Sequence, residues 1–555
     1  MLKGIKASSG IAIGKAFVIK EHDFKPLKTE IKDSSLEQKR FNKAVEKAKE
    51  ELEELIEATI ENFTKNEGEI FEAHLTMLDD PEFIGVVKGK ILKEKINAEY
   101  ALKTVCDELV EVFNGIEDEY LKERIVDIKD VTERILRILT GQTEEDIKNI
   151  REKSIIISKD ITPSQTAQMD KNKVLGFATE MGGITSHSSI IARNLGIPAV
   201  LGIHNLLNEV KNGEILILDG NEGRVILNPN EKTLQNYKEK MEKYMKDKKE
   251  LLEYRDLESI TLDFRKVEIA GNIGTVEEVD SIIENGGDGI GLFRTEFLYM
   301  EKENFPNEEE QFLAYKRVVE KLNGKPVVIR TLDIGGDKKL PYLPIEEELN
   351  PFLGYRAIRL CLDRKDIFKT QLRALLRASK YGNLKIMFPM ICNLEELLES
   401  KKVLEECKNE LKEEGLKYDE NLEVGIMIEV PSAAIISDIL AKEVDFFSIG
   451  TNDLIQYTMA VDRMNEKVSY LYDFNNLALL RLIKLVIENG HNAGIWVGMC
   501  GEMAGREELI PLLLGMGLDE FSMSPSSILK VRKIIRNINF KECVKIKDTY
   551  KLKFE

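Results

Sequence analysis

The sequence predicts a multidomain α/β protein that ends in a (β/α)8 barrel, and three patterns in its 555 residues point to this fold class. Eight short apolar segments alternate with helical stretches over residues 256–555. Charged sequence with helical periodicity fills residues 21–143, and short strand patterns with turns fill most of residues 144–230. A chain of this length also corresponds to roughly three or four domains.

The opening residues read as β-structure. The segment Gly10–Ile19 has the composition of a strand pair or hairpin, and charged helical sequence follows it directly. Strand patterns with turns return from residue 154 onward, and they include 154–158, 174–177 and 214–218. We therefore expect residues 1–20 to pair with the later strands. On this interpretation, residues 1–20 and 144–230 form one α/β domain and residues 21–143 are an inserted α-helical subdomain.

Two apolar stripes support the helical subdomain. One stripe has the spacing of a helix face and consists of Leu102, Val105, Cys106, Leu109, Val110 and Phe113. A shorter stripe contains His74 and stops at Asp79-Asp80-Pro81. We interpret His74 and Cys106 as packed side chains, because each lies on an apolar stripe. Residues 231–255, rich in Lys and Glu, are predicted to be a linker helix.

The barrel prediction for residues 256–555 is strengthened by polar residues that follow its strands. The predicted strands are Val267–Ile273, Gly289–Phe293, Val327–Arg330, Lys385–Phe388, Val424–Ile428, Phe446–Ile449, Ile495–Gly498 and Glu520–Ser522. Directly after them come Arg294, Thr295, Glu296, Arg330, Asp333, Glu429, Asn452, Asp453, Cys500 and Glu502. Active sites of such barrels lie where the strands end, so this pattern indicates an enzyme.

Charge and composition exclude several kinds of partner. The net charge of −18 argues against nucleic acid or an anionic membrane surface as the main partner. The start of the chain lacks the apolar run of a signal peptide, and no apolar stretch is long enough to span a bilayer, so we expect a cytoplasmic protein. The six cysteines form no CxxC pair. Residues 21–140 carry 19 basic against 30 acidic side chains, which fits either a basic protein partner or a solvated charged face.

The segment Met181–Arg193 places His187 at the start of a short predicted helix. Gly182 permits a tight turn, and Thr185 is a suitable capping residue. At a helix start, backbone N–H groups and the helix dipole favour negative charge, so a phosphoryl group on the imidazole would be stabilised. The alternative is a capping histidine without chemistry.

The predicted mouth of the barrel combines carboxylates with cations. Glu429 and Asp453 supply the oxygen ligands that Mg²⁺ prefers. Positive side chains at the same rim suit a small polyanion that bears phosphate or carboxylate, although each could instead form an ordinary salt bridge. These side chains are Arg294, Arg330, Lys338 and Arg463. Cys500, between glycines, could be a general acid, a nucleophile or a buried structural thiol.

Six segments of this chain resemble one enzyme family over nearly its whole length. They are Gly182–His187, Gly289–Met300, Arg330–Lys338, Asn350–Arg356, Phe446–Asp453 and Gly498–Glu502. The family is enzyme I of the bacterial sugar phosphotransferase system, the phosphoenolpyruvate-protein phosphotransferases. The chain departs from the family pattern at Ser9, Ile455, Arg506 and Pro525 without losing any of the groups proposed above.

The resemblance implies a role for each of these groups. His187 would be the phosphorylated histidine, Glu429 and Asp453 would bind Mg²⁺, and Cys500 would protonate the enolpyruvate carbon. Phosphoenolpyruvate would be held by Arg294, Arg330, Asn452 and Arg463, with Asp453 at the same site and Lys338 and Thr185 nearby.

The resemblance also implies partners and an architecture. Residues 1–20 and 144–230 would be a phosphohistidine domain, 21–143 an HPr-binding subdomain, and 256–555 a phosphoenolpyruvate-binding TIM barrel with a dimerisation surface. His187 would then serve two sites in turn by a swivel about residues 231–255. The alternatives are an enzyme like pyruvate phosphate dikinase or phosphoenolpyruvate synthase, and a catalytically dead scaffold that binds HPr or pyruvate. The segment before His187 is largely helical and lacks a Gly-rich nucleotide loop, which disfavours ATP chemistry.

Overall fold

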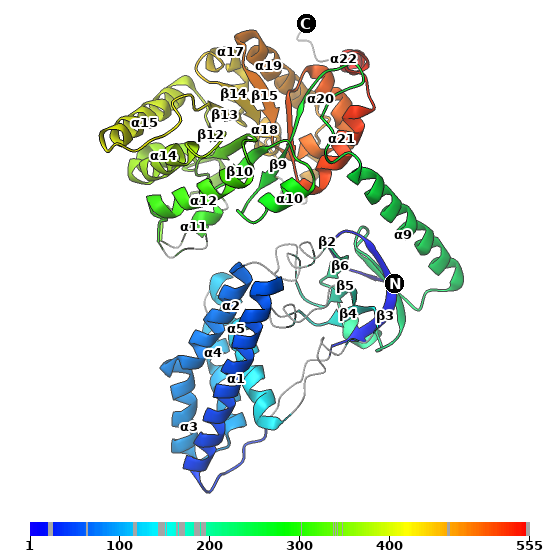
Figure 1. Ribbon diagram of the computed structural model, residues 1–555, viewed down its shortest axis with the longest axis vertical. Helices are drawn as coiled ribbons and strands as arrows, with labels where there is room; N and C mark the ends of the chain where they lie inside the picture. Colours follow the sequence, from blue (N-terminus) through cyan, green and yellow to red (C-terminus); the bar gives the residue numbers. More distant parts are fainter. Residues whose placement is uncertain are drawn as a thin grey trace. The chain divides into compact units, whose positions relative to one another are not determined.

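The computed structural model divides into two compact units, Met1–Asp247 and Lys248–Glu555. Figure 1 shows the order of the elements in each unit. The structure describes all residues except 20–25, 63–64, 115–118, 142–149, 151, 162–164, 166–172, 183–188, 190–191, 193–195, 301, 303, 337, 339, 341, 347, 463–464, 466 and 551–555. No helix within the described ranges is long and apolar enough to cross a membrane.

Part of the first unit is helical, as the sequence predicts for residues 21–143. The helices are α1 (Ser34–Asn62), α2 (Lys65–Asp79), α3 (Val86–Glu94), α4 (Ala98–Asn114) and α5 (Glu119–Thr140), with a short π-helical turn at Pro81–Gly85. α2 ends where the Asp-Asp-Pro sequence predicts. The apolar stripes form one core, in which Phe41, Leu102 and Val131 are fully buried.

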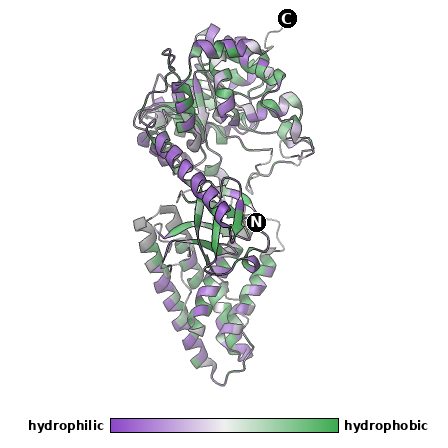
Figure 2. Cartoon of the chain, turned by 90° about the vertical axis from the view of Figure 1, so that its right-hand side faces the viewer, coloured by the Kyte–Doolittle hydropathy of each residue, from purple (hydrophilic) through white to green (hydrophobic). Residues whose placement is uncertain are grey.

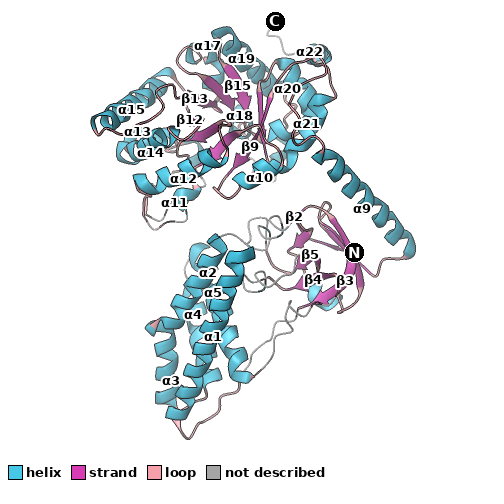
Figure 3. Ribbon diagram, in the orientation of Figure 1, coloured by secondary structure: helices cyan, strands magenta, loops and turns pink. Residues whose placement is uncertain are grey.

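The other part of the first unit is an eight-stranded sheet in the order β1-β8-β7-β3-β4-β5-β6-β2. Its strands are β1 (Leu2–Lys3), β2 (Ile5–Ser8), β3 (Ile11–Val18), β4 (Ser154–Ser158), β5 (Val174–Thr179), β6 (Ala199–Leu201), β7 (Ile215–Asp219) and β8 (Arg224–Leu227). Figure 3 shows these strands in magenta. The short helix α8 (Leu206–Glu209) joins β6 to β7.

The pairing of the opening strands agrees with one expectation and contradicts another. β3 lies between β4 and β7, and β2 pairs with β6, so the first residues join the later strands as predicted. β2 and β3 do not pair with each other, so the predicted hairpin is wrong. The hairpin does not form because β4 and β7 pair with the two edges of β3 and leave no edge for β2.

A long helix, α9 (Glu231–Leu252), occupies the predicted linker segment. Figure 2 shows it as mostly hydrophilic. Tyr237 is buried, but Met245 is 60% exposed, so the apolar side chains of this helix are only partly packed.

The second unit is a closed barrel of eight parallel strands, which confirms the predicted fold class. The strands are β9 (Glu268–Ile273), β10 (Ile290–Arg294), β11 (Val327–Arg330), β12 (Leu384–Phe388), β13 (Val424–Ile428), β14 (Phe446–Ile449), β15 (Trp496–Met499) and β16 (Glu520–Met523). Each predicted segment corresponds to one strand within one residue at either end. Strands of a parallel barrel are buried on both faces and therefore appear in sequence as short apolar runs.

Helices surround these strands (Figure 3). They are α10 (Val279–Glu284), α11 (Phe297–Met300), α12 (Glu308–Lys321), α13 (Ile358–Asp363), α14 (Lys365–Ser379), α15 (Leu394–Glu413), α16 (Pro431–Ile435), α17 (Ser437–Leu440), α18 (Thr451–Met459), α19 (Leu477–Ala493), α20 (Ile510–Met516), α21 (Ile528–Arg536) and α22 (Phe540–Thr549). The interior of the barrel contains a smaller apolar layer that includes Leu292, Met427 and Phe446. A filled interior leaves the ends of the barrel for binding.

Candidate functional site

The carboxyl ends of the barrel strands carry most of the side chains that the sequence singles out. Arg294 and Arg330 are the last residues of β10 and β11 and are neighbours in the strand register. Glu429 directly follows β13, and Cys500 directly follows β15. Because all eight strands are parallel, these residues lie at the same end of the barrel.

Arg330 is the centre of a buried ion-pair cluster. Its guanidinium contacts the carboxylate of Glu296, and its Nη1 lies 3.0 Å from Oδ2 of Asp333. Lys338 lies 3.4 Å from Oε1 of the same Glu296. The Nε–H of Arg330 is buried and has no hydrogen-bond partner among the described residues. Arg294, by contrast, is exposed.

The structure adds Arg356 to this cluster, a residue that the rim pattern did not single out. Arg356 lies 2.9 Å from Asp333 and 3.5 Å from Oδ2 of Asp453, and it donates to the hydroxyl of Tyr457 at 3.2 Å. Burial opposes ionisation of Asp333, but Arg330 and Arg356 outweigh it and hold its pKa far below the usual range. Asp333 therefore stays ionised and holds two arginines in place.

Glu429 has the opposite electrostatic environment. It is 1% exposed, and its Oε1 accepts a hydrogen bond of 2.7 Å from the backbone N–H of Met390. Burial, followed by the nearby carboxylates of Asp453 and Asp333, raises the pKa of Glu429 to about 8. A divalent cation between Glu429 and Asp453 would relieve both causes, so this pair fits a metal with oxygen ligands.

Asn452 is bonded in both directions to the segment after β15. Its Nδ2 donates to Oε1 of Glu502 at 3.3 Å, and its Oδ1 accepts from the backbone N–H of Glu502 at 3.1 Å. Asn452 and Asp453 belong to the first turn of α18, which starts directly after β14. These bonds fix the loop after β14 against the loop that carries Cys500.

Cys500 is buried, with its thiol 3.9 Å from the carbonyl oxygen of Ile449. Burial raises the pKa of this thiol to about 11. The thiol is therefore protonated at neutral pH, which suits a proton donor and disfavours a nucleophilic thiolate. Of the three interpretations of Cys500, the general acid and the structural thiol remain.

Three of the predicted site residues, His187, Thr185 and Arg463, lie outside the described residues, as does most of the predicted helix 188–195. Gly182, which precedes this segment, has a φ of 100°. Such a backbone conformation strongly favours glycine and agrees with the predicted turn. The roles of these three residues remain predictions.

The structure also describes four other side chains that the sequence singled out. His74 is buried, and its Nε2 lies 3.1 Å from Asp127, while Cys106 is part of the helical core region as predicted. Of the departures from the family pattern, Ile455 is fully buried in α18. The guanidinium of Arg506 lies 4.6 Å from the centroid of the Phe474 ring.

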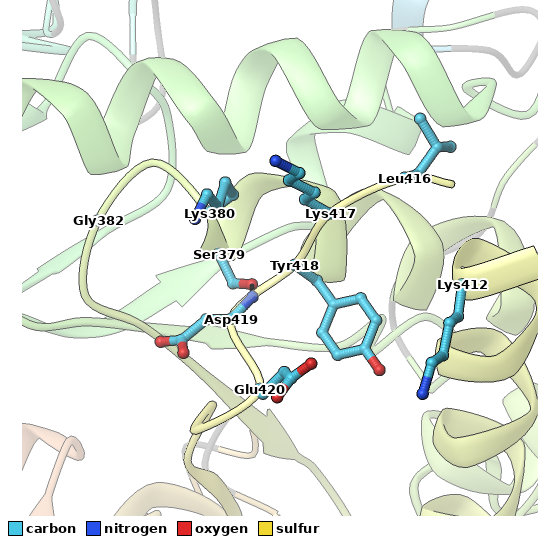
Figure 4. Close-up of a pocket in the computed structure, with 9 residues that line it drawn as sticks. All are labelled: Ser379, Lys380, Gly382, Lys412, Leu416, Lys417, Tyr418, Asp419 and Glu420. Carbon is cyan, nitrogen blue, oxygen red and sulfur yellow. Dashed lines mark hydrogen bonds between the residues drawn. The ribbon is translucent and has the colours of Figure 1, made fainter. Parts of the chain in front are cut away.

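A surface pocket of about 610 Å³ lies at the opposite end of the barrel (Figure 4). It is formed where α14 and α15 end and where the chain approaches β12 and β13. The lining residues are Ser379, Lys380, Gly382, Lys412, Leu416, Lys417, Tyr418, Asp419 and Glu420. None of them is a predicted site residue. This pocket is therefore separate from the buried ion-pair cluster around Arg330, which we call the cation cluster and which consists of Arg330, Lys338 and Arg356 with Glu296 and Asp333.

Comparison with known proteins agrees with the geometry of the barrel. Models of three parts of the PEP-utilising enzymes match the chain: the N-terminal part at residues 3–124, the mobile domain at 150–223 and the PEP-binding domain at 248–540. The fold and these matches thus define a PEP-utilising enzyme. Enzymes of this class transfer phosphoryl groups and generally use a divalent metal.

Curated relatives narrow the class to one family. The phosphoenolpyruvate-protein phosphotransferase of Priestia megaterium is 52% identical over 538 residues, which are 97% of this chain and 94% of the relative. That of Bacillus subtilis (strain 168) is 52% identical over 547 residues, 99% and 96% of the two chains. This chain belongs to the phosphoenolpyruvate-protein phosphotransferase family. A solved enzyme I structure that is 44% identical covers 44% of this chain and 100% of its own, with a TM-score of 0.39.

Proposed function

We propose that this protein transfers the phosphoryl group of phosphoenolpyruvate to His187 and from there to the phosphocarrier HPr, releasing pyruvate. This would be the first step of the phosphotransferase system for sugar uptake. The observation that carries the proposal is the buried cluster of Arg330 and Arg356 around Asp333 at the carboxyl end of the barrel. The named activity of relatives that are 52% identical over nearly the full chain supports it.

The cation cluster would hold the phosphate and carboxylate of the substrate. Arg294, Arg330 and Arg463 would contact the anion, and Lys338 would approach it from the loop after β11. Asn452 would present its side-chain amide from α18. Arg330 retains an N–H donor without a described partner, which supports its role as an anion ligand.

Glu429 and Asp453 would hold Mg²⁺. The donor set favours a divalent cation because both ligands are carboxylates and because burial, followed by the nearby carboxylate of Asp453, raises the pKa of Glu429. The bound ion would supply positive charge that lowers the cost of developing negative charge on the phosphoryl group.

The chemical step would be an in-line attack by a neutral ring nitrogen of His187 on phosphorus. The P–N bond forms as the bond from phosphorus to the enol oxygen breaks, and the electron pair leaves with the enolate of pyruvate. The protonated thiol of Cys500 would deliver its proton to the enolate carbon, giving pyruvate. Conversion of the enol to the ketone makes the transfer effectively complete.

The partners and domain roles of the proposal follow from the family resemblance. The acidic helices within 21–143 would dock HPr, which we take to be locally basic where it binds. The sheet unit, residues 1–20 and 144–230, would carry the phosphohistidine, and a swivel about 231–255 would let His187 serve both sites. We also propose that the protein is cytoplasmic and forms a homodimer through the barrel, residues 256–555.

The proposal is tested by incubating the protein with Mg²⁺ and phosphoenolpyruvate labelled at phosphorus. We expect an acid-labile label on the wild type, no label on His187→Ala, and transfer of the label to added HPr. A label that persists in His187→Ala would refute the assignment of His187. Labelling by ATP instead of phosphoenolpyruvate would indicate a dikinase-like enzyme, and binding of HPr without any labelling would indicate a scaffold.

A further inference from the structure

Behind the cation cluster lies a set of buried, uncharged side chains joined by hydrogen bonds. Each member is at most 1% exposed, and the members are Thr295, Tyr299, Gln311, Tyr315 and Gln371. They come from the segment after β10, from α12 and from α14. Burying polar groups is costly unless they are bonded, so the bonds of this set are informative.

Gln371, on α14, makes three of these hydrogen bonds. Its Nε2 donates to Oγ1 of Thr295 at 3.1 Å and to the hydroxyl of Tyr315 at 3.1 Å. Its Oε1 accepts from the backbone N–H of Leu332 at 2.8 Å. Both donors and the acceptor of the amide are therefore used without any charged partner.

Other hydrogen bonds of the set end on backbone carbonyls. Thr295 donates to the backbone carbonyl of Arg330 at 3.0 Å, and Tyr315 donates to Oε1 of Gln311 at 2.9 Å. Gln311 in turn donates to the carbonyl of Pro306 at 3.0 Å. A buried network in which each donor has an acceptor favours one arrangement over all others.

Gln371 joins the two segments that carry the cation cluster. Thr295 stands between Arg294 and Glu296 in the chain, and Leu332 is the neighbour of Asp333. One amide therefore bridges the segment after β10 and the segment after β11, in addition to the direct bond of Thr295 to the carbonyl of Arg330. The ion pair of Arg330 with Glu296 spans the same two segments, and the pair of Arg330 with Asp333 lies within the second of them.

We propose that Gln371 is a positioning residue for the phosphoenolpyruvate site, which it serves by holding these two segments in register. This inference rests on the proposed function. The hydrogen bonds of Gln371 go to no charged group of the cluster, and the two that reach the segments of the cluster are those with Thr295 and Leu332. A misplacement of about 1 Å in groups that position a substrate can lower the rate about 100-fold, so the amide has a measurable effect.

The test compares Gln371→Met with Gln311→Met. Both substitutions replace a buried amide by an apolar side chain of similar length, but Gln311 bonds Tyr299, Tyr315 and Pro306 and not Thr295 or Leu332, which are the chain neighbours of Glu296 and Asp333. For Gln371→Met we expect the KM for phosphoenolpyruvate, and its Kd by calorimetry with Mg²⁺, to rise about tenfold or more. For Gln311→Met we expect a similar loss of melting temperature with both constants within about twofold of the wild type.

Two further outcomes separate the possible failures. If Gln371→Met lowers only the melting temperature and leaves KM and Kd unchanged, Gln371 is structural and the inference is wrong. If Gln371→Met does not fold, Thr295→Val removes the bond between Gln371 and Thr295, together with the bond of Thr295 to the carbonyl of Arg330, and is expected to raise KM and Kd in the same direction. Unchanged constants there also overturn the inference. Absence of phosphorylation of the wild type would instead count against the proposed function.

Discussion

The most direct test of the barrel's internal electrostatics is the substitution Glu520→Gln. Glu520 is the first residue of β16 and lies beside Glu268 of β9 in the strand register. It is 4% exposed, its Oε1 has no hydrogen-bond partner among the described residues, and it occupies space left by the missing Cβ of Gly291. Burial, followed by the carboxylate of Glu268, raises the pKa of Glu520 to about 8, while Lys385 opposes the shift.

The sign and size of the effect follow from this pKa. Between pH 4.5 and about pH 8, the folded state keeps a proton on Glu520 that the unfolded state has lost. The free energy of unfolding therefore falls as the pH rises through this window. At about 1.4 kcal/mol for each pH unit, the full loss is roughly 5 kcal/mol as an upper bound. A glutamine is neutral at every pH, so Glu520→Gln is expected to remove this loss and to be more stable than the wild type at pH 9.

The assay is urea unfolding at about pH 5, 7 and 9, followed by the fluorescence of Trp496. Trp496 is the one tryptophan of the chain and stacks on Phe446 inside the barrel, with 4.5 Å between ring centroids. Glu284→Gln, an exposed substitution on α10, serves as the matched control and is expected to parallel the wild type. If wild type and Glu520→Gln lose the same stability between pH 5 and 9, the reasoning is refuted.

Three further predictions concern the cation cluster and its neighbours. Cys500→Ala is expected to lower kcat about 100-fold with little change in the KM for phosphoenolpyruvate, measured by coupled release of pyruvate; an unchanged kcat would exclude the thiol as the acid. Glu429→Gln is expected to raise the Mg²⁺ concentration for half-maximal rate about tenfold or more, and an unchanged Mg²⁺ titration would contradict the metal assignment. Asp333→Asn leaves two buried arginines without their shared carboxylate and is expected to destabilise the barrel by about 3–5 kcal/mol in urea, with partial recovery on adding phosphate. A loss of unfolding free energy below about 1 kcal/mol would mean that solvent already screens the ion pairs between Asp333 and the two arginines.

The strands of the barrel could be read from the sequence nearly residue by residue. Val327–Arg330, Val424–Ile428 and Phe446–Ile449 match their predicted bounds at both ends. These strands are short apolar runs bounded by polar residues, and burial on both faces imposes that pattern locally. The pairing partners of β2 and of β3 could not be predicted in the same way. They depend on which strands, distant in the sequence, lie beside β2 and β3 in the folded sheet.

The candidate site was only partly predictable for a related reason. Arg294, Glu429 and Cys500 adjoin strands, so their common position follows from the parallel order of the barrel. Arg356 lies far along the chain from β11, and only the folded loop brings it to Asp333 and Asp453. The signal that could have found it was the resemblance segment Asn350–Arg356, which contains it.

The sequence by itself determined the fold class, the family and the end of the barrel where the polar side chains gather. The fold class and this end of the barrel depend on periodicity and on residues next to strands, and the family depends on the resemblance of six short segments. All of these are local properties of the chain. The tertiary structure decided which side chains meet: Asp333 between two arginines, Glu429 near Asp453, and Gln371 bonded to both segments of the cluster. Hydrogen bonds and ion pairs act over a few ångströms in space, so sequence spacing cannot specify them.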